Sequence, residues 1–189
     1  MRKLICVGLL AALVSLPLWA QGSLKPHQDG SRIGFSLRHL TGRAEGVFEI
    51  YDGKLDFVEK KPEQSKVSFE IDVASVNTEN TKRDDHLRGS DYFHAKKFPK
   101  MTFHSERFNP VGDNRFMVTG PLTIKGHTKT VSFPVTLDRK TQLWATGQDA
   151  LTFKVNFTLD RTEFGVGESS SLLGSEVTVD ILMEFRNRG

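Results

Sequence analysis

Apolar and polar residues alternate with a period of two through nearly the whole chain after residue 30. The clearest case is the stretch in which Val67, Phe69, Ile71 and Val73 are separated by a serine and two carboxylates. Successive side chains of a β-strand point to opposite faces, so this pattern predicts a sheet with one apolar and one polar face. Such a sheet must cover its apolar face, and this requirement limits the folds that are open to the chain.

Eight alternating segments follow one another, joined mostly by short turns, which favours antiparallel pairing. The segments cover residues 33–37, 44–57, 67–73, 101–106, 116–124, 131–137, 151–159 and 177–185. The apolar phase of the second segment flips near Asp52-Gly53, which predicts a turn or a glycine bulge there. Further turns are predicted at Gly112-Asp113-Asn114, at residues 125–128 and at residues 138–141.

Too few helical segments exist to cover the apolar face, so two all-β folds remain. Two sheets can pack as a sandwich, or one sheet can curl into a barrel. Eight is the strand number at which a barrel interior just holds side chains or one small ligand. The length of the strands favours the barrel, because an open sheet would leave long edges exposed. We therefore predict an extended eight-stranded antiparallel barrel, with the sandwich as the alternative.

Residues 1–20 have the features of a cleavable secretory signal. Two positive charges precede an apolar run from Leu4 to Trp19, and the small residue Ala20 follows. The run is shorter than the ~20 apolar residues that span a bilayer and contains a proline, which disfavours the alternative of an uncleaved membrane anchor. We expect cleavage near Ala20, a mature domain over residues 21–189, and a periplasmic or secreted location.

Loss of the signal also changes the charge and the cysteine content. The formal net charge falls from +3 to +1, because Arg2 and Lys3 leave, and no Lys/Arg stripe of the kind that nucleic acid requires is visible. Cys6 is the only cysteine and leaves as well, so the mature domain has no disulfide and depends on its core. We predict no nucleic-acid partner.

Phenylalanine dominates the apolar face, since the chain has 14 Phe against 2 Tyr and 2 Trp. Ala44, Gly46 and Gly120 lie on the same face and are interpreted as leaving room among the large rings. Together these residues suggest a pocket for a long apolar ligand, with a solid core of Phe and Val as the alternative. Membrane-inserted barrels carry girdles of Tyr and Trp, so we predict no stable membrane insertion.

The segment from Thr78 to Phe93 interrupts the alternation and concentrates charge. His86 beside Asp84 or Asp85 could act as a general base with an orienting carboxylate, but no nucleophile motif accompanies them. The six histidines show no metal-ligand spacing, so neither a metal nor a cofactor is predicted.

A structural interpretation of the same segment is a short polar helix that closes one end of the barrel. The helix would run from about Asn80 to Arg88, end at Gly89, and gain support from an Asp84–Arg88 pair at i, i+4. Apolar residues of the connection would then turn inward over the channel end: Leu87, Tyr92, Phe93 and Phe98.

Several runs of residues closely resemble the signature of the YceI-like family. They are residues 83–88 with Asp91-Tyr92-Phe93 and Phe98-Pro99, residues 120–129, residues 160–165, and residues 35–40. The match covers essentially the whole of the mature domain, in the right order. Two departures are Gly30, where family members often have histidine, and His94, where an acidic residue is common.

The resemblance implies a lipocalin-like barrel that binds a polyisoprenoid or similar long-chain lipid in an elongated apolar channel, in an exported protein that can form a homodimer. It implies no catalytic activity, so we expect a binding protein and not an enzyme. Two alternatives stay open: a lipid-acting enzyme that uses His86 with Asp84 or Asp85, and a solid barrel that serves as a stress-related protein-interaction module. The predicted ligand-binding residues are Phe35, Phe48, Phe69, Ile71, Phe93, Phe103, Phe116, Val118, Phe133, Phe153, Phe157 and Ile181.

Overall fold

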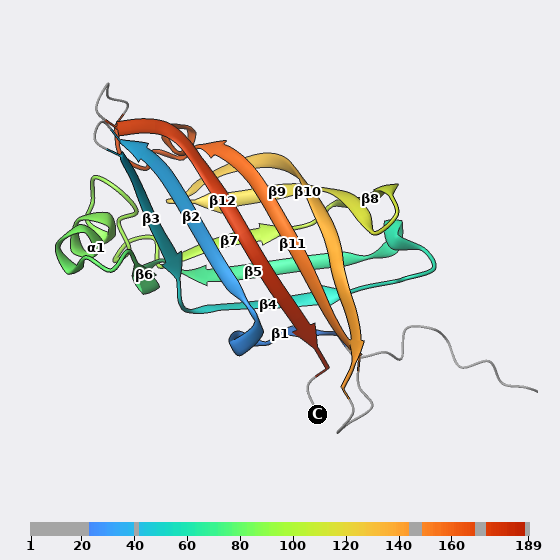
Figure 1. The fold of residues 1–189 in the computed structure, drawn as a ribbon. Helices are drawn as coiled ribbons and strands as arrows, with labels where there is room; N and C mark the ends of the chain where they lie inside the picture. The colour runs from blue at the N-terminus through green and yellow to red at the C-terminus, as the bar shows by residue number, and fades with distance from the viewer. Residues whose placement is uncertain (1–22, 40–41, 144–148, 169–172, 188–189) are drawn as a thin grey trace, which may run out of the picture.

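A single antiparallel sheet and one α-helix make up most of the computed structural model, which describes residues 23–39, 42–143, 149–168 and 173–187 (Figure 1). The predicted signal segment lies outside the described residues. The strands are β1 Lys25–Pro26, β2 Arg32–His39, β3 Gly42–Phe48, β4 Tyr51–Asp56, β5 Lys66–Asp72, β6 Val76–Asn77, β7 Lys100–His104, β8 Arg107–Gly112, β9 Arg115–Ile124, β10 His127–Gln142, β11 Asp149–Asp160 and β12 Leu173–Arg186. The helices are α1 Thr81–Arg88 and the short 3-10 helices η2 Gln28–Gly30, η3 Pro62–Gln64, η4 Val73–Ser75 and η5 Arg161–Phe164.

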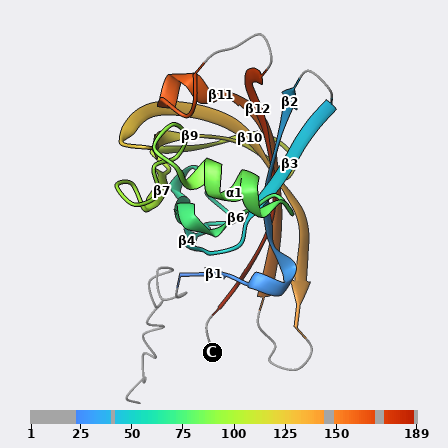
Figure 2. The ribbon, with the colours of Figure 1, turned by 90° about the vertical axis from the view of Figure 1, so that its left-hand side faces the viewer.

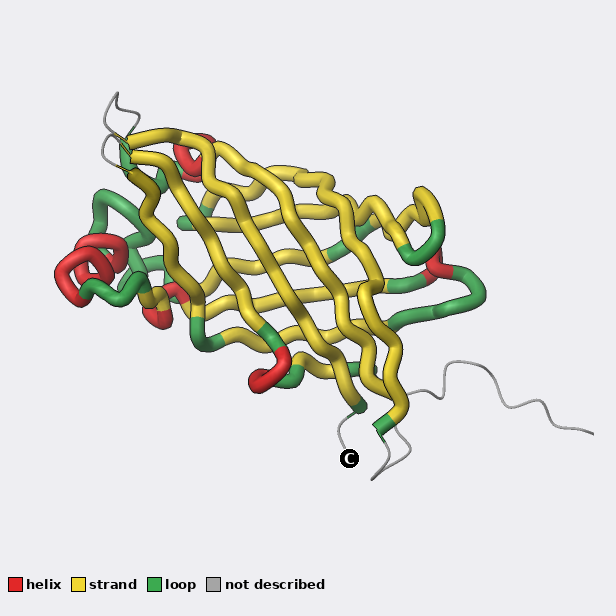
Figure 3. The backbone as a smooth tube through the Cα atoms, viewed as in Figure 1, coloured by secondary structure: helices red, strands yellow, loops and turns green. Residues whose placement is uncertain are grey.

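The sheet is curled, with neighbouring strands in the order β4-β5-β7-β9-β10-β11-β12-β2-β3-β6, while β1 pairs with β12 and β8 pairs with β9. The long strands β10, β11 and β12 cross in front of β4, β5 and β7 (Figures 1 and 3). β3 continues directly into β4, so the chain itself joins the two flanks of the sheet. The curled sheet confirms the all-β prediction and encloses its own apolar face.

Period-two alternation appears in the structure as alternating burial. In β7, Met101 and Phe103 are buried, whereas Lys100 and His104 are exposed. Each buried apolar side chain contributes about 1.5–3 kcal/mol by leaving water, so the alternation decides which face of each strand turns inward.

The buried positions change from even to odd residue numbers earlier than predicted, at the bend between β3 and β4. Phe48 at the end of β3 and Tyr51 at the start of β4 are both buried, while Ile50 between them is 60% exposed. Asp52-Gly53 is therefore not a turn, because Gly53 lies inside β4 opposite Phe69. The bend at residues 49–50 carries the chain from one flank of the sheet to the other.

The turn predictions have mixed outcomes. Lys125 and Gly126, with φ of 50° and 78°, form the two-residue turn between β9 and β10, as predicted for residues 125–128. Residues 113–114 connect β8 and β9, also as predicted. The turn predicted at residues 138–141 is wrong, because β10 continues through this stretch and only shifts its register between Leu137 and Arg139.

Twelve strands are present in the described part of the chain instead of the predicted eight. The second predicted segment is divided into β3 and β4. The strands β1 and β6 have only two residues each, and β8 buries only Phe108, so none of these three shows a period. The short strand β1 still has a structural role. Lys25 pairs with Arg186 of β12, and the neighbouring Leu24 forms a β-bridge to Leu55 of β4. The segment therefore connects β12 and β4, two strands that do not pair with each other.

Helix α1 lies at one end of the curled sheet and faces the viewer in Figure 2. The Asn80 side chain accepts a hydrogen bond from the Arg83 backbone N–H, and Gly89 ends the helix, so the predicted boundaries are confirmed. Among the helices that the structure describes, none is long and apolar enough to cross a membrane.

Candidate functional site: an apolar channel

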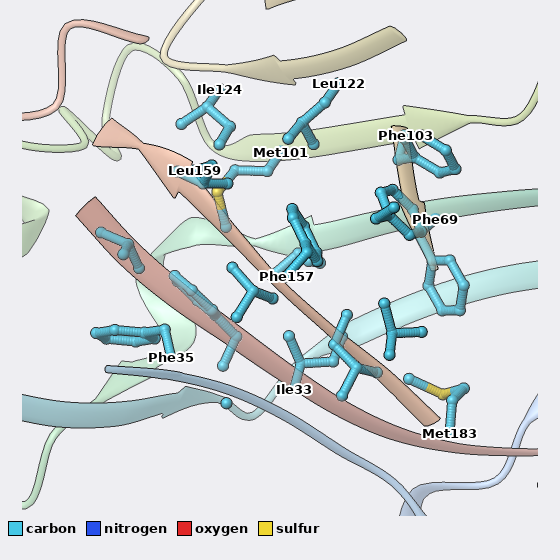
Figure 4. Close-up of a pocket in the computed structure, with 18 of the residues that line it drawn as sticks. Ile33, Phe35, Phe69, Met101, Phe103, Leu122, Ile124, Phe157, Leu159 and Met183 are labelled. Atoms are coloured by element: carbon cyan, nitrogen blue, oxygen red, sulfur yellow. The ribbon is translucent and has the colours of Figure 1, made fainter. Parts of the chain in front are cut away.

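The inward faces of the strands surround a cavity of about 230 Å³. Side chains from β2, β11 and β12 and from β5, β7 and β9 are directed into the same space (Figure 4). Within the described residues, only apolar atoms form the surface of this cavity. The volume is more than ten times the ~15 Å³ that one water needs, but water also needs polar partners, so the site suits an apolar occupant.

Rings in the middle of the sheet are packed on one another yet only partly buried. Phe133 and Phe157 stack with ring centroids 4.7 Å apart, and Phe103 lies 5.1 Å from Phe133. Phe133 and Phe157 are half-buried, although both lie on the inward phase of their strands. A solid core would bury them fully, so the middle of the sheet forms the wall of a channel.

An aromatic cluster fills the end of the channel opposite to α1. Phe57 packs edge-on against Phe108, Phe116 and Phe153, at centroid distances of 6.3, 5.9 and 5.7 Å. Phe153 also packs against Phe185 at 6.0 Å. The three partners of Phe57 are almost completely buried, so this end is solid.

The connection that contains α1 lies across the other end. Leu87, Tyr92 and Phe93 line the cavity, and the Phe93 ring packs edge-on against Phe48 at 5.8 Å. The Phe93 backbone N–H donates to the Leu87 carbonyl at 3.0 Å, which fixes the turn that brings this ring inward. Phe98, which was expected to turn inward with them, is not on the cavity wall and packs beneath Gly126.

Helix η5 and the loop that follows it supply further wall through Phe164 and Val166. The buried Arg161 guanidinium holds this loop by donating to backbone carbonyls, among them those of Val166 at 2.6 Å and Gly174 at 3.0 Å. The Thr162 hydroxyl and backbone N–H donate to Asp160, and these bonds lower the pKa of its carboxyl group. These bonds hold the loop together and attach it to the start of β12, while Phe164 and Val166 face the cavity.

Hydrogen bonds around Thr78 attach α1 to the sheet. The buried Asp84 carboxylate accepts from the Thr78 N–H at 2.9 Å and from the Thr78 hydroxyl at 2.6 Å. Arg83 donates to the Thr78 hydroxyl and carbonyl oxygens, both at 2.8 Å. The predicted Asp84–Arg88 pair is wrong, because Asp84 turns inward and Arg88 pairs with the exposed Asp85 at 3.1 Å.

The candidate general base and its carboxylates do not converge. The His86 ring is exposed and packs edge-on against Tyr92 at 4.8 Å. Asp84 bonds to Thr78 and Asp85 bonds to Arg88, so each of the three groups has a different neighbour. In the described ranges, no group of three or more His, Cys, Asp or Glu side chains could hold a metal ion.

Eleven of the twelve predicted ligand-binding residues lie on the cavity wall; their contact with a ligand stays a prediction. They are Phe35, Phe48, Phe69, Ile71, Phe93, Phe103, Val118, Phe133, Phe153, Phe157 and Ile181. Phe116 is instead part of the aromatic cluster and does not line the cavity. Phe116 lies on the same inward face of the sheet as the wall residues, but the rings of Phe57 and Phe108 cover the Phe116 ring.

Sequence reasoning missed wall residues of two kinds. Many are apolar residues at the inward positions of alternating strands, so the period-two pattern could have identified them. Examples are Ile33, Leu122, Val155 and Val179. Phe164 and Val166 belong to a loop without alternation, so no period indicates them.

The two glycines of the apolar face, Gly46 and Gly120, do not leave room in the manner predicted. A Cβ added to Gly46 would lie 2.6 Å from the Phe35 ring, and one added to Gly120 would lie 1.9 Å from the His104 backbone oxygen. These glycines instead allow a ring and a backbone corner to approach the sheet closely.

Comparison with known proteins gives a family match over residues 25–185, to the YceI-like domain. A UPF0312 protein from Pseudomonas putida is 32% identical over 154 residues, which cover 79% of this chain and 76% of that protein.

Solved structures with similar folds include Burkholderia cenocepacia BcnA, with a TM-score of 0.78, 29% identity, and coverage of 84% of this chain and 98% of that one. A polyisoprenoid-binding domain from Saccharophagus degradans, implicated in plant cell wall breakdown, has a TM-score of 0.68 at 13% identity, covering 87% of this chain and 98% of that one. At this identity the second likeness shows the fold alone.

Proposed function

The chain belongs to the YceI-like domain family, and from that premise we propose that it holds one long-chain isoprenoid or similar lipid in the apolar channel of a lipocalin-like barrel. The observation that carries the proposal is the set of half-buried rings, Phe133 and Phe157 among them, around a cavity without polar surface. The name of the Saccharophagus degradans domain, which has the same fold, agrees with this ligand class.

Energetics support occupation of the channel. At about 24 cal/mol per Å³, an empty cavity of about 230 Å³ would cost about 5 kcal/mol, which is comparable with the whole stability of many domains. A hydrocarbon chain removes that cost and contributes about 0.8 kcal/mol for each buried methylene, before the cost of ordering the chain. The apolar wall makes no hydrogen bonds, so the channel selects a ligand by its length and width.

We also propose that the protein acts after export, in the periplasm or outside the cell, with transport, storage or sequestration of the lipid as its role. The proposal rests on the charged, apolar and small-residue pattern of residues 1–20. Amino-terminal sequencing of the protein from separated cell fractions tests it, with a first residue close to Gln21 as the expected result. A cytoplasmic protein that retains Met1 would contradict it.

Filling the channel with a larger side chain tests the binding function. Ile181 points into the cavity, and its neighbour Leu182 is 37% exposed on the outer face of the same strand. We expect Ile181→Trp to reduce binding of an added isoprenoid quinone about tenfold or more, because the indole occupies chain volume, whereas Leu182→Trp leaves binding unchanged. Fluorescence titration of the delipidated proteins measures both, and equal affinity of the two folded variants would contradict the proposal.

A further inference from the structure

Two segments without a single carboxylate meet at the α1 end of the channel. Residues 92–105 and residues 116–137 contain lysines but neither Asp nor Glu. β7 pairs with β9 across them, and the Phe98 ring lies beneath Gly126 in the turn between β9 and β10. We define the basic patch as the lysines of these two segments: Lys96, Lys97, Lys100, Lys125 and Lys129.

Most of the positive charge of the basic patch has no carboxylate partner. Lys100 lies 3.6 Å from Asp72, but Lys125 donates to the Gly165 carbonyl at 2.6 Å, which leaves its charge uncompensated. No salt bridge among the described residues involves Lys96, Lys97 or Lys129, and all three are exposed. Carboxylates near the basic patch are those of Asp72, of Asp91, whose backbone carbonyl also accepts from Lys125 at 3.4 Å, and of Glu163 on η5.

The basic patch lies next to the channel wall at several points. Lys100 directly precedes the wall residue Met101, Lys125 directly follows the wall residue Ile124, and Lys96 is three residues after Phe93. The start of β7 and the turn between β9 and β10 lie at the same end of the molecule as α1 (Figures 1 and 2). Positive charge is therefore gathered at the end where apolar side chains of a connection, and not an aromatic cluster, close the channel.

We propose that the basic patch docks the protein on an anionic lipid bilayer, with the α1 end of the channel toward the membrane. A bilayer offers negative headgroups at its surface and hydrocarbon chains beneath them, which matches lysines placed beside an apolar channel. The attraction extends over about one Debye length, so it holds the protein at the surface without insertion. Docking of this kind rests on the proposed function, because its use is to pass a lipid chain between bilayer and channel.

A charge-reversal experiment with a matched control tests the docking. Lys96→Glu/Lys97→Glu alters the exposed lysine pair of the basic patch, and Lys60→Glu/Lys61→Glu alters an exposed pair in the β4–β5 connection at the opposite end (Figure 1). Co-sedimentation with vesicles of phosphatidylglycerol and phosphatidylcholine at low salt measures the affinity. We expect the first variant to bind about tenfold more weakly or worse, since each lysine near an anionic surface contributes to binding, and the control to bind like the wild type.

Other outcomes separate this inference from the proposed function. Equal loss of binding in both variants, or wild-type binding that is the same on pure phosphatidylcholine vesicles, would overturn the docking surface. If the glutamate variant does not fold, Lys96→Gln/Lys97→Gln, which removes the charges without reversing them, takes its place in the same vesicle assay. The lipid content of the purified protein and its uptake of added isoprenoid are measured separately, so vesicle binding by a protein that neither contains lipid nor takes up isoprenoid would overturn only the proposed function.

Discussion

Thr78 is the residue on which the attachment of α1 depends. Its backbone and hydroxyl groups take part in four hydrogen bonds with Asp84 and Arg83, and both Thr78 and Asp84 are buried. Bonds to a buried carboxylate are stronger than those between neutral groups, and their loss leaves donors without partners.

Asp84→Ala is therefore expected to lower the free energy of unfolding by about 1–3 kcal/mol, because the Thr78 N–H and hydroxyl lose their acceptor. Asp85→Ala provides the control, since Asp85 is exposed and its ion pair with Arg88 contributes less than about 1 kcal/mol. Urea unfolding of both variants measures the difference. Equal stability of the two variants would show that the buried network does not hold α1.

Gly120 allows the corner between β7 and β8 to approach β9. A Cβ at this position would lie 1.9 Å from the His104 backbone oxygen, an atom that cannot move without the strand. Gly120→Ala should lower the free energy of unfolding by about 3 kcal/mol or more through this overlap. At Gly34 the added Cβ would meet only the end of the Arg32 side chain, so Gly34→Ala is expected to cost little; thermal unfolding of both tests the contrast.

At the scale of elements, the connection from β6 to β7 closes one end of the channel. Two of its residues have positive φ: Glu79, before α1, with 60°, and His94, after α1, with 53°. Positive φ is unfavourable for residues with a Cβ, so neighbouring contacts must hold both positions. His94 is held through its N–H, which donates to the Gly89 carbonyl at 2.8 Å. The closure is thus a defined structure that presents Phe93 to the channel.

Phe93→Ala should shorten the residence time of a bound lipid by removing the ring that covers the chain. Phe98→Ala is the matched control, because this ring is half-buried in the same connection but does not line the cavity. Transfer of a fluorescent isoprenoid from the loaded protein to excess detergent micelles measures the release rate. Release at the same rate from both folded variants would show that Phe93 does not control retention.

At the scale of the whole molecule, alternation predicted the curled sheet because the same physical requirement, burial of one face, acts on every long strand. Ten of the predicted residues that line the cavity follow from this alternation, while Phe93 follows from the predicted closure of the channel end. The bend at residues 49–50 could not be predicted, since Ile50 continues the apolar phase of Phe48 and yet faces water. Phe116 shows the other limit: the period assigns a side chain to a face, but ring packing decides whether that part of the face is hollow.

Native mass spectrometry of the protein purified from its own cell envelope, combined with analysis of an organic extract, tests the central claim most directly. We predict one additional mass per folded chain, which organic solvent removes and which the extract identifies as a lipid with a long isoprenoid or similar chain. A folded protein of unmodified mass, with an extract free of such lipid and no uptake of added isoprenoid, would contradict the account.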